Sequence, residues 1–215
     1  MIMENSMTDV RKVPKDSMEE VILHTAEDMF LSNGYNGVST TDIARKVGCN
    51  QALIHYYYRT KQNLFAKVYE RKIQSIFDVV KSRLGDGISF EEKIRRVVEI
   101  HFDFLMENPR LPLFLLEEAR NNEEAIAIIR RFMSLYKDEF MSVLEKSIAA
   151  EVERGTIGEI SAFDLIMDIA SLNVFPFIVN PIVRNIVRLD EEQYRSFLED
   201  RKREVVRLIM SRLKK

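Results

Sequence analysis

Apolar residues recur at helical spacing along most of the chain, and no run alternates as a half-buried strand does. In the first such segment, one face of a helix would carry Ile22, Ala26, Met29 and Phe30. Ser17 followed by Glu20 has the form of a capping box, so we expect this helix to begin at Ser17. The glycines of "SNGYNG" then suit the left-handed conformation of a helix exit.

Two short helices follow in "STTDIARKVG" and "QALIHYYY". Ser39 and Asp42 predict a second capping box, and Gly48 predicts the end of the helix that it starts. Asn50 is a good N-cap for the next helix. Two short helices joined by a tight turn with glycine predict a helix-turn-helix, and a longer helix over 61–84 comes next.

The rest of the chain predicts five further helices with short breaks. We expect them at 89–109, 111–121, 122–155, 161–180 and 190–213. Pro176 should kink or shorten the fourth of these. The predicted fold is all-α with about nine helices: three in an N-terminal helix-turn-helix domain and the others in a C-terminal helical domain.

Composition agrees with a helix-rich globular protein, since 46% of the 215 residues are hydrophobic, 31% are charged and only 7 are glycine. A single cysteine excludes an intrachain disulfide and favours a cytoplasmic location, and the polar N-terminus lacks a signal-peptide pattern. The most apolar stretch, 165–183, is interrupted by polar residues and prolines. We therefore expect a buried helix covered by a ligand, a partner chain or both, and no membrane span.

Charge is unevenly distributed around the predicted helix-turn-helix. Residues 16–42 hold acidic side chains and no lysine or arginine, whereas residues 43–72 hold one acidic residue, Glu70, and these cations: Arg45, Lys46, Arg59, Lys61, Lys67, Arg71 and Lys72. Local basic clustering is typical of nucleic-acid binding. A pair of helices with complementary charges is the alternative interpretation.

The stretch "GYNGVSTTDIARKVGCNQALIHYYYRTKQNLF", residues 34–65, resembles the DNA-binding domain of the tetracycline-repressor (TetR) family of bacterial regulators. The matching positions are Gly37, Ser39, Ile43, Ala44, Gly48, Ile54, Tyr57, Tyr58, Lys61 and Leu64. His55 departs from the pattern, because the family most often has tyrosine there. The first helix also matches, with Ile22, Ala26, Phe30, Gly34 and Tyr35, so the resemblance covers about 50 residues. The remaining 150 or so match the family only in length and helicity.

This resemblance implies a domain order and a function. It predicts a mobile tail at 1–16, a DNA-binding domain at 17–62 and an effector-binding and dimerisation domain at 63–215. The family implies a repressor that binds a palindromic, double-stranded DNA operator as a homodimer and is released by a small, largely hydrophobic effector. We expect the dimer to form through the last two helices, about 161–213, because their apolar surface is in excess.

In a helix-turn-helix, the N-terminal part of the second helix faces base edges. That places Gln51, Ala52 and His55 in position to read bases, and glutamine can pair with adenine through two hydrogen bonds. Thr41 should reach a base or a phosphate. Expected phosphate contacts are Thr40, Tyr57 and Lys61, while Tyr58 should enter the core and Tyr56 should pack partly on a neighbouring helix. The alternative is that Gln51, Thr41 and Lys61 are ordinary solvent-facing residues.

The C-terminal domain offers an interior rich in methionine and aromatic residues, which suits an adaptable pocket. Our candidates for effector binding are His101, Phe102, Leu105, Phe114, Met133, Tyr136, Met167 and Asn173, and we expect Met106, Phe140 and Phe175 in the same interior. His101 and Asn173 stand out as polar residues within apolar helices. For most of the set, ordinary core packing is the competing interpretation, and for His101 a hydrogen-bonded core position is favoured.

Other functions have little support. There is no H-E-x-x-H, G-x-S-x-G or phosphate-loop motif and no paired cysteine, so we expect neither an enzyme nor a metal or cofactor site. We expect Cys49 to be buried and inert, with redox sensing as the alternative. A hydrophobic-ligand-binding protein with weak or lost DNA binding is the second function that the sequence leaves open.

Overall fold

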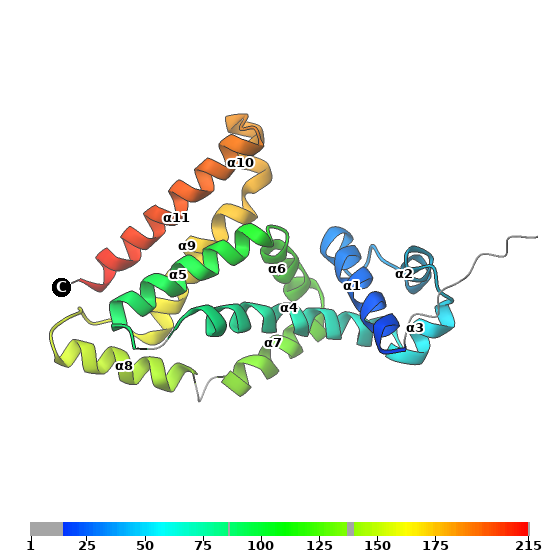
Figure 1. Cartoon of the computed structure of the whole chain (residues 1–215), viewed down its shortest axis with the longest axis horizontal. Helices are drawn as coiled ribbons and strands as arrows, with labels where there is room; N and C mark the ends of the chain where they lie inside the picture. Colours follow the sequence, from blue (N-terminus) through cyan, green and yellow to red (C-terminus); the bar gives the residue numbers. More distant parts are fainter. Residues whose placement is uncertain (1–14, 86, 137–139, 215) are drawn as a thin grey trace, which may run out of the picture. The chain divides into compact units, whose positions relative to one another are not determined.

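The computed structural model describes residues 15–85, 87–136 and 140–214, with the side chains of 15–17, 135 and 136 left out. Within these ranges the chain is entirely helical (Figure 1). The helices are α1 Lys15–Asn33, α2 Thr40–Val47, α3 Gln51–Tyr58, α4 Lys61–Arg83, α5 Phe90–Glu107, α6 Leu111–Asn121, α7 Glu123–Tyr136, α8 Ser142–Glu153, α9 Ala162–Ile178, α10 Asn180–Val187 and α11 Glu191–Leu213.

The all-α prediction is confirmed, but the helix expected at 161–180 is divided into two. The segment 122–155 holds α7 and α8, with Phe140 and Met141 in a wider π-type turn before α8. The prediction of one long helix depends on residues 137–139, which lie outside the described residues. The segment that contains Pro176 forms α9 and α10, whose axes differ by 53°. Proline removes a helical hydrogen bond, and α9 ends two residues after it.

Contacts divide the chain into one unit up to Val68 and a second from Tyr69, so the division falls inside α4. The first unit holds α1, α2 and α3. Its helix α1 begins at Lys15, two residues before the expected cap at Ser17. Phe30 lies at the centre of its core, with its ring 5.5 Å from that of Phe65 and 6.2 Å from that of Tyr35. An aromatic core therefore holds the short helices of this unit together.

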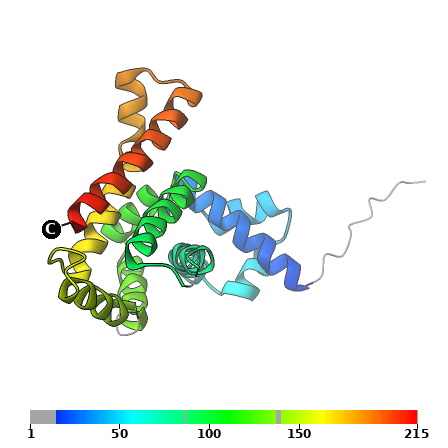
Figure 2. The same ribbon diagram turned by 60° about the vertical axis from the view of Figure 1, so that its left-hand side comes forward.

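The second unit is built on α5, α9 and α11, which pack against one another (Figure 2). Phe102 of α5 and Phe177 of α9 are both buried, with ring centroids 5.4 Å apart. Lys202 of α11 reaches Asp103 of α5 at 2.7 Å and Glu199 of its own helix at 2.8 Å. Burial disfavours the charge of Lys202, but these carboxylates outweigh it and raise the pKa of the ammonium group.

By length and composition, no single helix in the described ranges could cross a membrane. Helices α9 and α10 meet that criterion only when they are taken together across their bend.

Candidate nucleic-acid interface and effector region

Helices α2 and α3 are each defined by the caps that the sequence predicts. The Ser39 hydroxyl accepts a hydrogen bond from the Asp42 backbone N–H at 3.1 Å, and the Asp42 carboxylate accepts one from the Ser39 N–H at 3.3 Å. Hydrogen bonds from Ser39, with the Arg45 guanidinium nearby, lower the pKa of Asp42. Gly48 ends α2 at φ 78°, and the Asn50 side chain accepts from the Ala52 N–H at 2.8 Å. The predicted helix-turn-helix is confirmed.

The residues predicted to read bases lie together at the start of α3. Ala52 and His55 are exposed, and Gln51 is half-buried between α2 and the rest of α3. Its amide nitrogen donates to the Thr40 hydroxyl at 2.8 Å, and its amide oxygen accepts from the Thr41 hydroxyl at 3.2 Å. Nε2 of His55 lies 3.4 Å from the same amide nitrogen. The structure thus brings Thr40, Thr41, Gln51 and His55 into one polar cluster, and Gln51 is not the plain solvent-facing residue of the alternative interpretation.

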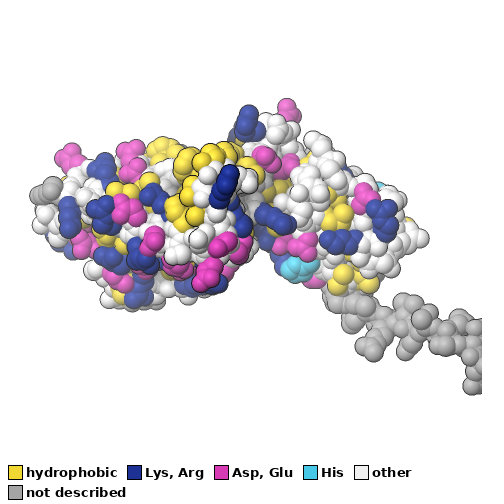
Figure 3. Space-filling model, turned by 90° about the horizontal axis from the view of Figure 1, so that it is seen from above, with side chains coloured by type: hydrophobic (Ala, Val, Ile, Leu, Met, Phe, Trp, Pro, Cys, Tyr) yellow, Lys and Arg dark blue, Asp and Glu magenta, His cyan; other side chains and the backbone are white. Residues whose placement is uncertain are grey.

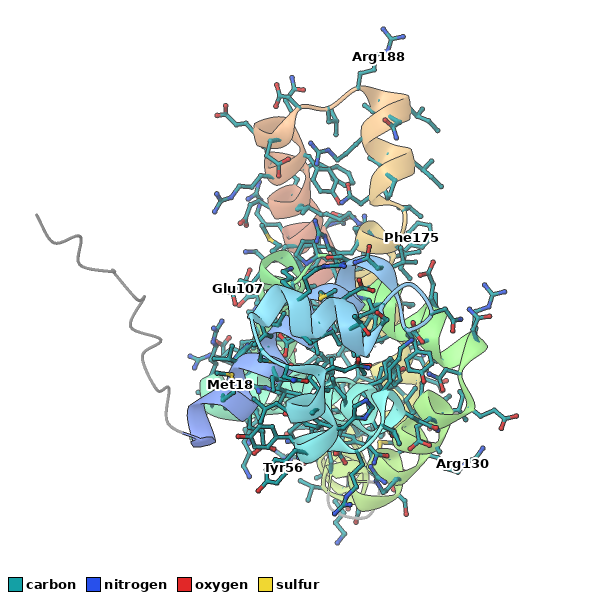
Figure 4. The ribbon with its side chains drawn as sticks, turned by 90° about the vertical axis from the view of Figure 1, so that its right-hand side faces the viewer. Met18, Tyr56, Glu107, Arg130, Phe175 and Arg188 are labelled. Atoms are coloured by element: carbon teal, nitrogen blue, oxygen red, sulfur yellow. The ribbon has the colours of Figure 1, made fainter. Side chains whose placement is uncertain are left out.

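The three consecutive tyrosines occupy three environments. Tyr58 is 7% exposed, and its hydroxyl donates to the Glu19 carbonyl at 3.1 Å, so its place in the core is confirmed. Tyr57 is half-buried and meets the Tyr56 ring edge to face at 5.2 Å. Tyr56 is 61% exposed at the surface of α3 (Figure 4), and its partial packing on a neighbouring helix stays a prediction. At 100° per residue, its direction falls outside the stripe that faces α1.

Lys61 is half-buried at the start of α4, with its ammonium group 4.0 Å from the centre of the Tyr35 ring. A cation over an aromatic face is attracted by the negative charge of the ring. Tyr35 therefore helps to place this lysine, although sequence reasoning had assigned no role to it. The signal was available, because Tyr35 belongs to the same stretch as the helix-turn-helix.

In the second unit, His101 and Asn173 form a polar pair between α5 and α9. The Asn173 amide nitrogen donates to the Val98 carbonyl at 3.0 Å and lies 3.2 Å from Nδ1 of His101. Because Val98 offers only an acceptor, this orientation of the amide is fixed, and Nδ1 of His101 must accept. Burial lowers the pKa of His101 to about 4, so the ring is neutral at pH 7. The favoured interpretation of His101 as a hydrogen-bonded core residue is confirmed.

The other candidates for effector binding separate into two groups. Phe102, Leu105 and Phe114 are buried, each less than 5% exposed. Met133 and Met167 are about half exposed, and Phe140 and Phe175 are exposed as well, so their expected place in the interior was wrong. Met167 and Phe175 lie on the face of α9 opposite its buried residues, a distinction that composition cannot make. The side chain of Tyr136 lies outside the described residues.

Two open clefts flank α8. One, of about 480 Å³, lies between α8 and the start of α5 and is lined by Ser89, Lys93, Lys146 and Arg154 among others. The second, of about 450 Å³, lies between α8 and the start of α9 and is lined by Ile148, Val152 and Ile160 among others. Neither cleft is lined by a residue that the sequence predicted to bind the effector.

Cys49, in the turn between α2 and α3, is half-buried and not fully buried as expected. Burial raises the pKa of its thiol, which lowers the thiolate fraction at neutral pH. An inert cysteine agrees with this microenvironment better than a redox sensor does.

Large apolar side chains are exposed along α9, α10 and α11. Phe163, Met167 and Phe175 follow one another at multiples of four residues on α9, and Figure 4 shows Phe175 on the outer side of that helix. Ile182, Ile186 and Val187 extend this surface on α10, and Leu208 adds to it from α11. In Figure 3, hydrophobic side chains gather over α10 and the adjoining end of α9. We call these seven residues the apolar face; exposed apolar surfaces of this extent mark interaction sites.

Comparison with known families agrees with this geometry. Residues 22–68 match the family described as bacterial regulatory proteins, tetR family, and residues 91–209 match the tetracyclin repressor-like C-terminal domain. Together these matches cover both units, and the chain belongs to the TetR family. The family and the relatives described next are regulators, not enzymes.

Two curated relatives and one solved structure are informative. The chain is 23% identical to the transcriptional activator FasR of Mycolicibacterium smegmatis over 44% of this chain and 43% of FasR. It is 21% identical to the fatty acid metabolism regulator protein of Bacillus subtilis over 64% of this chain and 70% of that protein. The match therefore spans less than half the length of the first relative.

The structure of FadR from Bacillus subtilis in complex with stearoyl-CoA superimposes with a TM-score of 0.67 and 19% identity. The alignment covers 91% of this chain and 99% of FadR. At this identity, the likeness establishes a shared fold.

Proposed function

We propose that this protein is a transcriptional repressor that binds a palindromic DNA operator as a homodimer and is released by a small, hydrophobic effector. The observation that carries the proposal is the capped helix-turn-helix, with Ala52 and His55 exposed at the start of α3 and the Thr40, Thr41 and Gln51 side chains beside them. In this motif the second helix enters the major groove. Membership of the TetR family supports the same function.

Roles in DNA binding follow from position. Gln51, Ala52 and His55 face base edges, Thr41 reaches a base or a phosphate, and Tyr57 and Lys61 hold the phosphate backbone. Thr40 and the N–H groups at the start of α2 add further phosphate contacts. Lys61 suits this role because its ammonium group lies 4.0 Å from the centre of the Tyr35 ring, which helps to place the cation at the start of α4.

We assign the dimer contact to the apolar face. Ile186 is 75% exposed, Phe163 64% and Phe175 63%, which is unfavourable unless a second copy covers them. A two-fold dimer places the same surface on both sides of the contact. It would also present two copies of α3 to half-sites about 34–36 Å apart or at a multiple of that distance. This contact lies within the expected surface at about 161–213, which α9, α10 and α11 form.

For the effector we propose a fatty acyl thioester. The buried Phe102, Leu105 and Phe114 supply the apolar surroundings that an acyl chain requires, and the polar pair of His101 and Asn173 offers a neutral group for the thioester region. The solved relative that carries stearoyl-CoA supports this class of ligand. Because α4 runs from the first unit into the second, we propose that effector binding acts on the DNA-binding unit through α4.

Fluorescence anisotropy with duplex DNA from upstream of the protein's own gene tests DNA binding. We expect binding that weakens as salt rises, because phosphate contacts release counterions. The double substitution Tyr57→Ala/Lys61→Ala should remove it, whereas Lys67→Ala, an exposed cation on α4, serves as the control. Binding no tighter than to random DNA, together with retained ligand binding, would favour the alternative of a ligand-binding protein that has lost DNA recognition.

The dimer contact is tested by sedimentation of Ile186→Asp, which places a charge in the apolar face. We expect monomers at concentrations where the wild type is dimeric. Val143→Asp is the matched control, since Val143 is an exposed aliphatic residue on α8, 61% exposed, outside the apolar face. A dimer that survives Ile186→Asp would place the contact elsewhere.

A further inference from the structure

A chain of hydrogen bonds links α2, α3 and the turn after α3 through the side chain of Gln51. The Gln51 amide nitrogen lies 2.8 Å from the Thr40 hydroxyl oxygen and 3.4 Å from Nε2 of His55. The other ring nitrogen of His55, Nδ1, lies 2.9 Å from the backbone carbonyl oxygen of Arg59. Thr41 completes the set, because its hydroxyl lies 3.2 Å from the Gln51 amide oxygen.

The direction of each hydrogen bond follows from one fixed group, the Arg59 carbonyl. A carbonyl oxygen only accepts, so Nδ1 of His55 carries the hydrogen, and in the neutral ring Nε2 must then accept. Only the amide nitrogen of Gln51 can donate to it. The threonine hydroxyls can donate or accept and adapt to either orientation of the amide. The His55 tautomer therefore sets which way the Gln51 amide faces.

This arrangement uses both N–H groups of Gln51 within the protein, one toward Thr40 and one toward His55. The amide oxygen accepts one hydrogen bond from Thr41 and retains a second lone pair. Gln51 can thus accept a further hydrogen bond but has no N–H left to donate. The expected pairing with adenine requires a donor for N7 and an acceptor for the N6 amino group at the same time.

We propose that Gln51 reads its base only as an acceptor and so selects an exocyclic amino group, that of adenine or cytosine. Guanine and thymine are rejected, because the major-groove oxygens O6 and O4 are acceptors and would face the Gln51 oxygen. Thr40, Thr41 and His55 are positioning residues that hold the amide in this orientation. The inference rests on the proposed DNA-binding function and refines the adenine pairing that the sequence alone favours.

The backbone at Arg59 adds to the argument. Arg59 has φ 65° and ψ −50°, a positive-φ conformation that non-glycine residues seldom adopt, and it ends α3. The hydrogen bond from His55 to its carbonyl therefore ties the recognition helix to a turn whose conformation is itself constrained. The TetR family most often has tyrosine at position 55. Tyrosine has no ring nitrogen, so it could not fix the orientation of the Gln51 amide in this way.

The test is selection of operators from a library with randomised half-sites, followed by sequencing of the bound DNA. Gln51→Ala locates the base pair that Gln51 reads, because the base preference of this variant should be lost at that operator position and kept at the others. At that position we expect wild type to accept adenine and cytosine and to disfavour guanine and thymine by roughly tenfold. Thr40→Val, which keeps the side-chain shape but removes the acceptor, frees one N–H and should shift the preference from both bases toward adenine.

Thr25→Val is the matched control, because the Thr25 hydroxyl donates to Val21 within α1 and lies outside the cluster. If Thr40 only contacts phosphate, Thr40→Val will weaken all sequences alike. That outcome, or a wild type that requires adenine and rejects cytosine, would overturn the acceptor-only role of Gln51 and leave the proposed DNA-binding function intact. If Thr40→Val does not fold, the wild-type and Gln51→Ala selections still decide. A wild type that enriches no sequence would instead overturn the proposed DNA reading itself.

Discussion

The two units of this protein use their polar side chains in contrasting ways. In the first unit, Thr40, Thr41, Gln51 and His55 are partly or fully exposed and bond to one another within fifteen residues of sequence. In the second, Asn173 is fully buried and bonds to Val98, on a helix far away in the chain. Polar groups near the surface can be offered to a partner. The buried Asn173 uses its amide nitrogen within the protein, whereas its Oδ1 has no hydrogen-bond partner among the described residues.

The difference shows which polar side chains serve binding and which serve stability. The first unit is held by an aromatic core and by helix caps, which leaves its polar cluster available for recognition. The second unit uses a buried amide, a neutral histidine and a lysine with two carboxylates to join α5, α9 and α11. Substitutions in the two units should therefore affect different measurements.

The largest effect is expected from Phe30→Ala, which removes the ring at the centre of the first unit. Phe30 is fully buried, and its loss should lower the stability of that unit by about 4 kcal/mol. Hydrogen–deuterium exchange should accelerate in α1, α2 and α3 while peptides from α5, α9 and α11 keep their protection. Val21→Ala, an exposed position on α1, is the control. Equally faster exchange in both units would contradict the claim that the two units are stabilised separately.

Between pH 6.5 and pH 4, a pH-dependent effect on stability is expected from His101 in the second unit. The folded pKa of His101, about 4, lies below the value of about 6.5 in an unfolded chain. Its contribution to stability is therefore complete above pH 6.5 and is lost as the pH falls toward 4, a change of about 3 kcal/mol.

Urea unfolding at pH 7.5, 5.5 and 4.5 measures this dependence. His101→Gln should flatten it, whereas His24→Gln, at an exposed position on α1, should leave it as in wild type. If wild type and His101→Gln lose stability in parallel as the pH falls, the buried neutral ring of His101 is not the source of the pH dependence.

A smaller effect is expected from the ion pair that joins α11 to α5. Lys202→Met keeps the apolar stem but leaves Asp103 and Glu199 without their shared cation. Because both carboxylates are about 40% exposed, solvent weakens the pair, and we expect a loss of about 1.5 kcal/mol in urea unfolding. Arg203→Met, which breaks an exposed pair within α11, should change stability by much less. Equal losses of stability in the two variants would mean that an ion pair between helices stabilises the protein no more than one within a helix.

The smallest effect concerns the cap of α2. Ser39→Ala removes the hydroxyl that accepts from the Asp42 N–H and should cost about 1 kcal/mol, seen as faster exchange at the start of α2. Ser32→Ala removes an exposed hydroxyl that donates to the Asp28 carbonyl within α1, so it should have almost no effect on exchange at α2. Unchanged exchange at α2 in Ser39→Ala would show that tertiary packing, and not the cap, fixes this helix.

The same contrast explains what could be predicted from the sequence. The caps at Ser39, Gly48 and Asn50 join residues at most four apart, so local chemistry alone determines the helix-turn-helix. The exposure of Met133 and Met167 depends instead on which faces of their helices are covered by distant segments. The pairing of His101 with Asn173 is of this second kind, since 72 residues separate them.

Within the candidate DNA site, the sequence predicted which residues take part but not the hydrogen bonds that they make to one another. Spacing placed Gln51 and His55 one helical turn apart, yet the role of the Arg59 carbonyl depends on a positive-φ residue that no sequence rule indicated.

The most direct test of the proposed function is a hydroxyl-radical footprint on DNA upstream of the protein's own gene, recorded with and without stearoyl-CoA. We predict two-fold symmetric protection, with half-sites about one helical turn apart or at a multiple of it, which disappears when stearoyl-CoA is added. Protection of a single half-site, or symmetric protection that stearoyl-CoA leaves unchanged, would contradict an effector-released dimeric repressor.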